Sequence, residues 1–343
     1  MTVMKNKALI VSTSPFYGGG EYYISNTLSL LEKEMKVEYL LLDKILIEKM
    51  RSDTRSIRAF SNQNSFTQWK ELKHVINEIK PNLIILNGGS TLYFAPLLWK
   101  QKLIYIRHTT NQCVANLFRR LLYILILHFC YCFTHVVVHV SKYSMKEQKL
   151  FKKKARCVHN GVIPQSEVSK EPVNPVRFLF VGRTDVSKGV DVIIEAFHNI
   201  NEQTATVDIV GSGPYSDVLS KLNMPSIRYH GFQNNVDEYY KTCDVFIALS
   251  DFENCPFSII DALNFSMPVI TTGVGGIGEM VFDGINGLVI TKHSAALQNA
   301  VKQLADNPKM VEKMGRKSKE IFNEHFTLDK NIVELKNIIK ELL

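Results

Sequence analysis

The sequence predicts an α/β protein made of two Rossmann-like domains, each a doubly wound parallel sheet, that face each other across a cleft. Its 343 residues are more than one ordinary hydrophobic core serves. Short apolar runs alternate with helical stretches along the whole chain. This alternation is typical of strands buried on both faces and joined by right-handed crossover helices. It is interrupted once near the middle, by a proline-containing stretch, which indicates two domains rather than one.

The expected strands are short runs of mostly apolar residues, and stretches with helical periodicity separate most of them. In the first half they are Lys7–Ser12, Val37–Leu42, Asn82–Leu86, Lys102–Ile106, His135–Val140 and Arg156–His159. In the second half they are Arg177–Val181, Thr206–Val210, Ile227–Tyr229, Val245–Ala248, Pro268–Thr271 and Gly287–Ile290. Ligands of such sheets bind beyond the carboxyl ends of the strands, so the loops that follow the strands are where chemistry is expected.

The domain boundaries follow from composition. Residues 1–163 are expected to form the first domain and residues 177–325 the second. Residues 164–176 contain three prolines and no apolar period, so we expect a linker there. Residues 326–343 are expected to form a terminal helix, because the Ile and Leu spacing of Leu328–Leu343 is that of an amphipathic packing helix.

Composition excludes several classes of protein. With 45% hydrophobic and 22% charged residues, the chain is neither collagen-like nor disordered. Six cysteines without a CxxC pair predict reduced thiols, and no zinc pattern is present. The net charge of +8 is uneven, since residues 1–165 hold 24 Lys and Arg against 10 Asp and Glu. A basic first domain fits an anionic surface or substrate, and equally a solvated basic face.

One segment needs a membrane interpretation. Leu121–Val140 has no charged residue and is long enough for a transmembrane helix. However, Leu117–Phe129 is helix-like whereas Thr134–Val140 is β-branched and strand-like, so we expect a helix that leads into a buried strand. Arg119 and Arg120 beside aromatic residues are compatible with peripheral contact at an anionic membrane. The expected location is cytoplasmic, with such contact at the inner face of the plasma membrane.

The loop with the most chemical character runs from Asp251 to Asp261. It follows a strand, and Pro256 is expected to be the first residue of the next helix. The first amides of that helix, at about Phe257 and Ser258, could hold a phosphate. Glu253 and Asp261 could accept hydrogen bonds from sugar hydroxyls. The alternative is an ordinary strand-to-helix turn with Asp261 as a solvated helix residue.

Three further loops follow strands. Arg183 and Lys188 flank a turn that could hold a diphosphate, or they are two surface cations. Glycine-rich turns bring backbone amides close to a ligand, and they are expected at Gly211 and Gly213 and at Gly19 and Gly20. The turn at Gly211 lacks the third glycine of GxGxxG, so a dinucleotide dehydrogenase is poorly supported.

His108 follows the apolar strand of the first domain and is expected to face the cleft, although most histidines at such places are structural. Neither a Ser-His-Asp motif nor GxSxG is present. No Asp-x-Asp occurs, so a divalent metal bridging a diphosphate has no obvious ligand pair. The charge of a departing diphosphate would then be met by cations and helix amides.

In this order the motifs resemble those of retaining glycosyltransferases of GT-B fold, specifically glycosyltransferase family 4. The resembling segments span nearly the whole chain and are strongest over residues 160–290. They are NGV before the linker, FVGRTDVSKGVDVIIEAF, VGSGP, CDVF, ENCPFSIID and GVGGIGEMVFDGINGLVI. ENCPFSIID is similar to the family's E-x7-E signature, with Asp261 in place of the second glutamate.

The resemblance implies roles that spacing alone does not. Arg183 and Lys188 resemble the pair that neutralises the donor diphosphate, and Glu253 resembles the residue that contacts the donor sugar. Asp261 takes the place of the ribose-binding glutamate, one methylene shorter, and a water could bridge the difference. Substrate contacts are also implied for the residues of the glycine turns, the motif loop and the first-domain histidine: Gly19, Gly20, Gly211, Gly213, Asn254, Cys255, Phe257, Ser258 and His108.

The implied reaction moves a sugar from a nucleotide-diphosphate sugar to a saccharide acceptor with retained configuration and without a metal or other cofactor. A lipid-linked acceptor in bacterial surface polysaccharide assembly (O-antigen, capsule or exopolysaccharide) is the preferred interpretation, and a soluble acceptor is the alternative. Two other classes remain open. One is a GT-B-like sugar-nucleotide epimerase. The other is a non-catalytic protein that binds nucleic acid or lipid through the basic half, although no nucleic-acid partner is expected.

Overall fold

The computed structural model describes residues 6–51, 55–114, 116–166 and 175–343. The chain divides into two compact units, each with its own parallel sheet. Unit 1 comprises Met1–Gly161 and Leu328–Leu343, and unit 2 comprises Val162–Thr327. The prediction of an α/β protein with two doubly wound parallel sheets is therefore confirmed.

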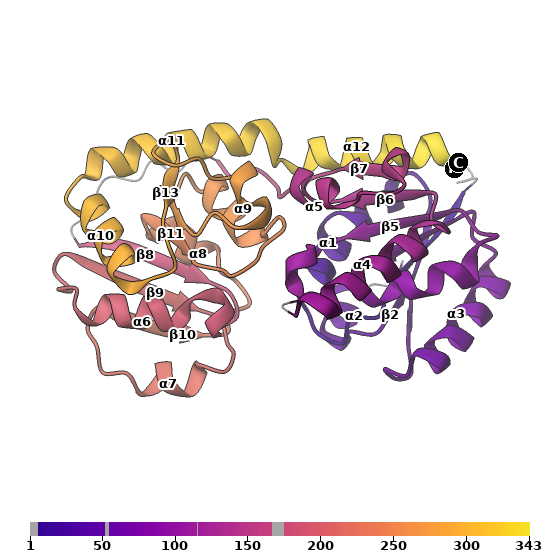
Figure 1. The fold of residues 1–343 in the computed structure, drawn as a ribbon, viewed down its shortest axis with the longest axis horizontal. Helices are drawn as coiled ribbons and strands as arrows, with labels where there is room; N and C mark the ends of the chain where they lie inside the picture. The colour runs from indigo at the N-terminus through magenta and orange to yellow at the C-terminus, as the bar shows by residue number, and fades with distance from the viewer. Residues whose placement is uncertain (1–5, 52–54, 115, 167–174) are drawn as a thin grey trace. The chain divides into compact units, whose positions relative to one another are not determined.

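Unit 1 contains a seven-stranded parallel sheet with strand order β3-β2-β1-β4-β5-β6-β7, drawn from indigo to magenta in Figure 1. Its strands are β1 (Lys7–Ser12), β2 (Lys36–Leu41), β3 (Ser56–Ala59), β4 (Leu83–Asn87), β5 (Leu103–Arg107), β6 (Val136–His139) and β7 (Ala155–Cys157). Its α-helices are α1 (Gly19–Asn26), α2 (Lys44–Met50), α3 (Ser65–Ile79), α4 (Leu117–Tyr131), α5 (Lys142–Glu147) and α12 (Leu328–Leu342). The 3-10 helices η1 (Leu28–Lys33), η2 (Gly89–Leu98), η3 (Asn111–Cys113) and η4 (Lys152–Lys154) complete it.

Alternating residues of the central strands of unit 1 are buried on opposite faces of the sheet. Leu9 and Val11 of β1 pack with α3, η2 and α4 in one cluster. Ile10, between them, is fully buried as well. Burial on both faces explains why these strands are continuous apolar runs in the sequence, and why crossover helices connect them. Pairs from α12 to Glu34 tie the last helix to this unit, with Lys336 Nζ 2.9 Å from Glu34 Oε1.

Unit 2 contains a six-stranded parallel sheet with strand order β10-β9-β8-β11-β12-β13. Its strands are β8 (Val176–Val181), β9 (Ala205–Val210), β10 (Ile227–Gly231), β11 (Val245–Ala248), β12 (Val269–Thr271) and β13 (Gly287–Val289). Its α-helices are α6 (Val190–His198), α7 (Ser216–Lys221), α8 (Asp237–Thr242), α9 (Phe257–Asn264), α10 (Ser294–Ala305) and α11 (Pro308–His325), with 3-10 turns η5 (Val186–Lys188) and η6 (Gly275–Glu279).

The strand expectations hold with end shifts of one or two residues, and one strand is missed. β3 (Ser56–Ala59) is a short edge strand whose residues are only partly buried, so it lacks the apolar run that reveals the others. The segment at Leu117 is confirmed as a helix, α4, that leads to the buried strand β6. Pro256 is the residue that caps α9 and not its first helical residue, which is Phe257. Residues 167–174 of the expected linker lie outside the described residues.

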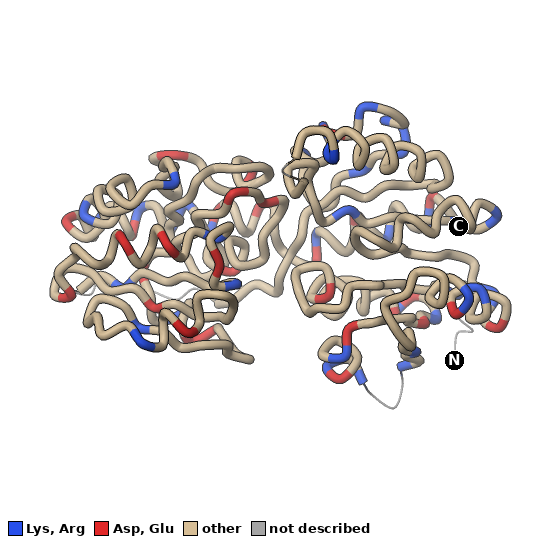
Figure 2. The backbone as a smooth tube through the Cα atoms, turned by 60° about the horizontal axis from the view of Figure 1, so that its bottom comes forward, with Lys and Arg blue, Asp and Glu red and all other residues tan. Residues whose placement is uncertain are grey.

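Basic and acidic positions are distributed differently in the two halves of the chain, and Figure 2 marks them along the backbone. Residues 1–165 carry 24 Lys and Arg against 10 Asp and Glu, whereas the rest of the chain carries 17 against 23. Within the described residues no helix is long and apolar enough to cross a bilayer.

Candidate functional site

In unit 2 the predicted residues gather where the strand order reverses. β9 lies on one side of β8 and β11 on the other, so the loops after β8 and β11 diverge there. Such a switch point is where doubly wound sheets leave room for ligands. Lys188 and Glu253, from these two loops, form a direct ion pair through Nζ and Oε1. The same carboxylate oxygen accepts a hydrogen bond of 2.9 Å from Ser250 Oγ.

Arg183 lies in the same loop as Lys188 and is held by Asp185. Its Nε pairs with Asp185 Oδ2, while Oδ1 accepts hydrogen bonds from Ser187 Oγ at 2.6 Å and from the Lys188 amide at 3.1 Å. Burial raises the pKa of Asp185, but the Ser187 hydroxyl and the Arg183 charge outweigh it and lower the pKa overall. The two predicted cations are thus joined through one aspartate, and Arg183 keeps its side chain 65% exposed.

The cations of this loop already have partners. Cations near a helix start are unfavourable, and an anionic ligand could compensate them. In the structure the carboxylates of Asp185 and Glu253 already provide that compensation. The case for an anionic ligand therefore depends on the shape of the surrounding loops rather than on an unbalanced charge.

The glycines after β9 permit an unusually close approach of two loops. A β-carbon on Gly211, whose φ is +134°, would lie 1.9 Å from the Gly182 carbonyl oxygen. A β-carbon on Gly213 would lie 2.8 Å from the carbonyl oxygen of Thr184. Hydrogen bonds continue between the loops beyond the strand ends, with the Thr184 amide donating to Ser212 O at 3.1 Å. Gly211 and Gly213 therefore shape the backbone next to Arg183.

The motif helix α9 begins directly after this loop. Asn254 and Cys255 are buried, and Phe257 and Ser258 form the first turn of the helix, whose earliest amides have no intrahelical acceptor as a rule. Asp261 lies one turn further along α9 and is partly buried. Burial and, to a lesser degree, the charge of Asp237 raise the pKa of Asp261 to about 7.

Two contacts at this site were not predicted from the sequence. Gly275, with φ +59°, sits against the backbone of Glu253, since a β-carbon there would be 1.9 Å from Glu253 O, and the Gly276 amide donates to that oxygen at 3.2 Å. Lys292 Nζ bonds Asp251 Oδ1 at 2.5 Å and Val186 O at 2.7 Å, which joins the two loops. The consecutive glycines at 275–276 are the sequence signal for the first, and only the fold reveals the second.

In unit 1 the predicted residues also meet at the reversal of strand order, here between β1 and β4. Gly19 and Gly20 form the first turn of α1, and His108 follows β5. Asn87, the last residue of β4, connects them: its amide nitrogen donates to Gly20 O at 3.0 Å, and its Oδ1 lies 2.9 Å from His108 Nε2. Asn87 was missed, and its signal was a polar residue ending an otherwise apolar strand.

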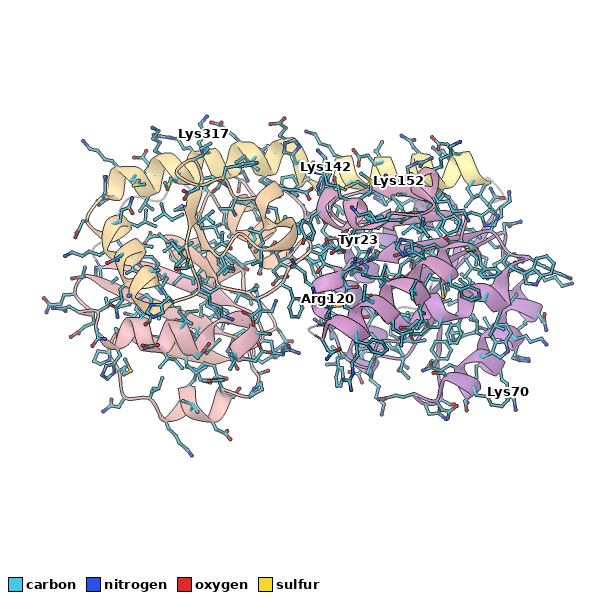
Figure 3. The ribbon with its side chains drawn as sticks, in the orientation of Figure 1. Tyr23, Lys70, Arg120, Lys142, Lys152 and Lys317 are labelled. Atoms are coloured by element: carbon cyan, nitrogen blue, oxygen red, sulfur yellow. The ribbon has the colours of Figure 1, made fainter. Side chains whose placement is uncertain are left out.

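This network sets the chemistry of His108. A carbonyl oxygen only accepts, so Gly20 O orients the Asn87 amide nitrogen toward itself, which leaves Oδ1 for the histidine. Nε2 must then carry the proton, and Nδ1 is a hydrogen-bond acceptor. Burial lowers the pKa of His108 to about 4, so the ring is neutral near pH 7. Tyr23, labelled in Figure 3, packs edge-on against the imidazole with ring centres 5.1 Å apart.

The predicted residues thus form two groups, one in each unit. Gly19, Gly20 and His108 belong to unit 1, and all the others belong to unit 2. Among the described residues no three His, Cys, Asp or Glu side chains are arranged to hold a metal ion.

Unit 2 is similar to a known protein family. Residues 163–321 match the model of the family described as Glycosyl transferases group 1. They make up nearly all of unit 2 and include the Arg183, Lys188 and Glu253 cluster.

Two curated relatives illustrate the range of the similarity. An uncharacterized glycosyltransferase of Methanocaldococcus jannaschii is 28% identical over 214 residues, which are 60% of this chain and 59% of that protein. An O-antigen biosynthesis glycosyltransferase of Escherichia coli, WbnH, is 24% identical over 299 residues, 84% of this chain and 86% of the relative. The first match therefore spans less than two thirds of the relative's length.

Among solved structures, the fold is similar to the crystal structure of Anabaena HepE in complex with UDP-glucose. The TM-score is 0.82 at 17% identity, over 98% of this chain and all of the other. At this identity the likeness concerns the fold, and it confirms the expected GT-B class of architecture.

Proposed function

We propose that this chain is a retaining, metal-independent glycosyltransferase of glycosyltransferase family 4, which moves a sugar from a nucleotide-diphosphate sugar to a saccharide acceptor. One observation carries the proposal: Lys188 and Glu253 meet at the switch point of the unit 2 sheet, beside glycine loops that bring backbone close to the same place. In a sugar nucleotide a diphosphate is joined to a sugar, so a cation beside a carboxylate suits it: the cation meets the diphosphate and the carboxylate accepts hydrogen bonds from the sugar hydroxyls.

The proposed donor site uses the groups of unit 2. Arg183 and Lys188 bind the diphosphate together with the first amides of α9, and Glu253 accepts hydrogen bonds from the donor sugar. Glu253 and Lys188 are bonded to each other without donor, so binding has to exchange that ion pair for a Lys–phosphate and a Glu–hydroxyl contact. Asp261 is proposed to bind the ribose hydroxyls, and with a pKa of about 7 it is partly protonated there near neutral pH.

In the proposed reaction the bond between the anomeric carbon and the diphosphate oxygen breaks. The acceptor oxygen bonds to that carbon on the same face, and its proton passes to the leaving phosphate. No protein nucleophile is needed. The positive charges of Arg183 and Lys188 stabilise the negative charge that develops on the leaving diphosphate, which supports a reaction without a metal. The neutral His108 of unit 1 is proposed to contact the donor sugar, with Nδ1 accepting from a hydroxyl.

The acceptor is proposed to be a lipid-linked saccharide of bacterial surface polysaccharide assembly, with the chain in peripheral contact with the membrane. The named function of the Escherichia coli relative and the basic first half of the chain support this choice. A soluble saccharide is the alternative, and a transfer assay with both kinds of acceptor distinguishes them.

The first test is a panel of nucleotide sugars measured by thermal stabilisation, since a bound donor raises apparent stability by mass action. The Arg183→Ala, Lys188→Ala double variant is expected to bind the matching nucleoside diphosphate roughly 100-fold more weakly, because two charge-assisted contacts are lost. The matched control removes two cations from the exposed face of α11, Arg316→Ala with Lys317→Ala. Equal affinity in both double variants would contradict the diphosphate site.

The second test separates the role of Glu253 from simple charge balance. Glu253→Gln is expected to keep or tighten nucleoside diphosphate binding, since Lys188 is released from its partner, while transfer falls by at least ~100-fold. If Glu253 had only a structural role, the variant would lose nucleoside diphosphate binding and transfer together.

Incubation of the donor without acceptor tests the epimerase alternative, because an epimerase would produce an isomerised sugar nucleotide. The anomeric configuration of the product and transfer in excess chelator test retention and metal independence.

A further inference from the structure

The helix α4 of unit 1 exposes apolar side chains on its outer surface. Six of them are 50% to 76% exposed and share one side of the helix. They are Leu117, Phe118, Leu121, Leu122, Leu125 and Phe129, called here the α4 apolar face. Their spacing of three and four residues places them together, while Leu127, Cys130 and Tyr131 face the core. Soluble proteins rarely expose so continuous an apolar strip without a partner.

The neighbouring η2 helix enlarges this surface. η2 packs against α4, and the chain at its end exposes Leu97 and Trp99 to 54% and 62%. Lys100 Nζ lies 5.1 Å from the centre of the Trp99 ring. Tryptophan beside lysine is a combination that suits the boundary between lipid and water, where the ring is apolar and the cation reaches outward.

The stretch of chain that carries the α4 apolar face is almost free of acidic residues. Residues 79–146 contain no Asp or Glu, and Glu147 is the one acidic residue between 79 and 166, against thirteen Lys and Arg. Glu147 is itself engaged with Arg107, whose Nη2 lies 2.9 Å from its carboxylate. Arg119 is exposed on α4, and Figure 3 labels Arg120 near the start of that helix and Lys152 on unit 1. The segment of Lys152 lies near the other end of α4, since Lys154 Nζ bonds Cys132 O at 2.8 Å.

We propose that the α4 apolar face is the surface by which this protein docks on an anionic lipid bilayer, with α4 lying flat in the interface. At 15 residues the helix is about 22 Å long, shorter than the roughly 30 Å apolar thickness of a bilayer, so it lies on the membrane rather than across it. A second copy of the chain fits this surface poorly, because a symmetric contact would bring together two copies of a stretch with thirteen Lys and Arg and one acidic residue.

This proposal assigns a surface to the membrane contact of the proposed function, but it does not depend on the sugar chemistry and is tested without a donor. The full chain is mixed with vesicles of phosphatidylcholine containing phosphatidylglycerol, and with vesicles of phosphatidylcholine alone. Binding is expected only to the anionic vesicles, and it should weaken as salt increases. Leu121→Gln with Leu125→Gln is expected to reduce binding by about tenfold for each leucine removed. The control pair, Val218→Gln with Val333→Gln, changes apolar residues on other helices that are 49% and 54% exposed, and it should bind as the unsubstituted chain does.

A second readout locates the contact. Phe118→Trp places an indole at the most exposed position of the face, and brominated lipid should quench its fluorescence, whereas Val218→Trp should not be quenched. Equal binding by the two Gln pairs, or no vesicle binding, would overturn the proposal. So would a dimer in sedimentation velocity that only the α4 pair dissolves, since the occupant would then be a second copy. Thermal stabilisation by the matching nucleotide sugar should survive the α4 substitutions, which separates this proposal from the enzymatic one.

Discussion

Replacing Asn87 by aspartate should raise the pKa of His108. Asn87 Oδ1 lies 2.9 Å from His108 Nε2, so the variant places a carboxylate oxygen at the same distance from a protonated ring nitrogen. The substitution is nearly isosteric, so the position of the ring should be kept. What changes is the charge that faces it, and the donor to Gly20 O is lost.

The size of the effect follows from the native environment. Burial lowers the pKa of His108 from 6.5 to about 4, a gap that corresponds to roughly 3 kcal/mol in favour of the neutral ring. An opposite charge in direct contact shifts a pKa by roughly 1 to 3 units. His108 of the variant should therefore titrate near pH ~6. The native protein should also lose up to roughly 3 kcal/mol of stability as the pH falls from 6.5 to about 4, because only the unfolded chain is protonated there.

The measurement is a nitrogen-detected NMR titration of the imidazoles, with His108 identified by its absence in His108→Gln. The unsubstituted protein should show a neutral ring with the proton on Nε2 down to about pH 4, and Asn87→Asp should show a charged ring below pH ~6. Asn64→Asp, at the exposed cap of α3, introduces the same charge elsewhere and should leave His108 unchanged. A native His108 that titrates near 6.5, or carries its proton on Nδ1, would refute the reasoning.

Two further predictions concern unit 2. Gly211→Ala should lower the free energy of unfolding in urea by at least ~3 kcal/mol, because the new β-carbon would collide with Gly182 O. The control Gly278→Ala has open space around it and should cost about 1 kcal/mol or less; similar losses for both variants would contradict the loop geometry. Asp261→Asn should match the native stability near pH 4 and exceed it by a growing amount up to about pH 7, by at most about 4 kcal/mol. The unfolded carboxyl loses its proton near its usual pKa of 3.8, whereas burial keeps the proton on the folded carboxyl up to about pH 7, so the native protein loses stability between these two pH values; parallel pH profiles would exclude this effect.

Much of the fold could be read from local patterns. Strands buried on both faces are continuous apolar runs, so β1 and β11 were predicted to the residue, whereas the partly buried edge strand β3 has no such pattern and was missed. The helical character of α4 was also evident from its spacing. The side of α4 that faces solvent was not evident from the sequence, because the segment is apolar all round. Only the packing of η2 and the sheet against α4 distinguishes its buried side from its exposed side.

The candidate site divides in the same way. Residue type and position after a strand were enough to select Arg183, Lys188, Glu253 and His108, since charged or polar side chains that follow buried strands are visible in any linear sequence. That Lys188 bonds Glu253 across 65 residues, and that Asn87 fixes the tautomer of His108, depends on strand order. β8 is adjacent to β11, and β4 to β5, only once the sheets have formed. Side-chain chemistry is local information, whereas adjacency is a property of the assembled sheet, and hydrogen bonds act over about 3 Å of space however long the intervening chain is.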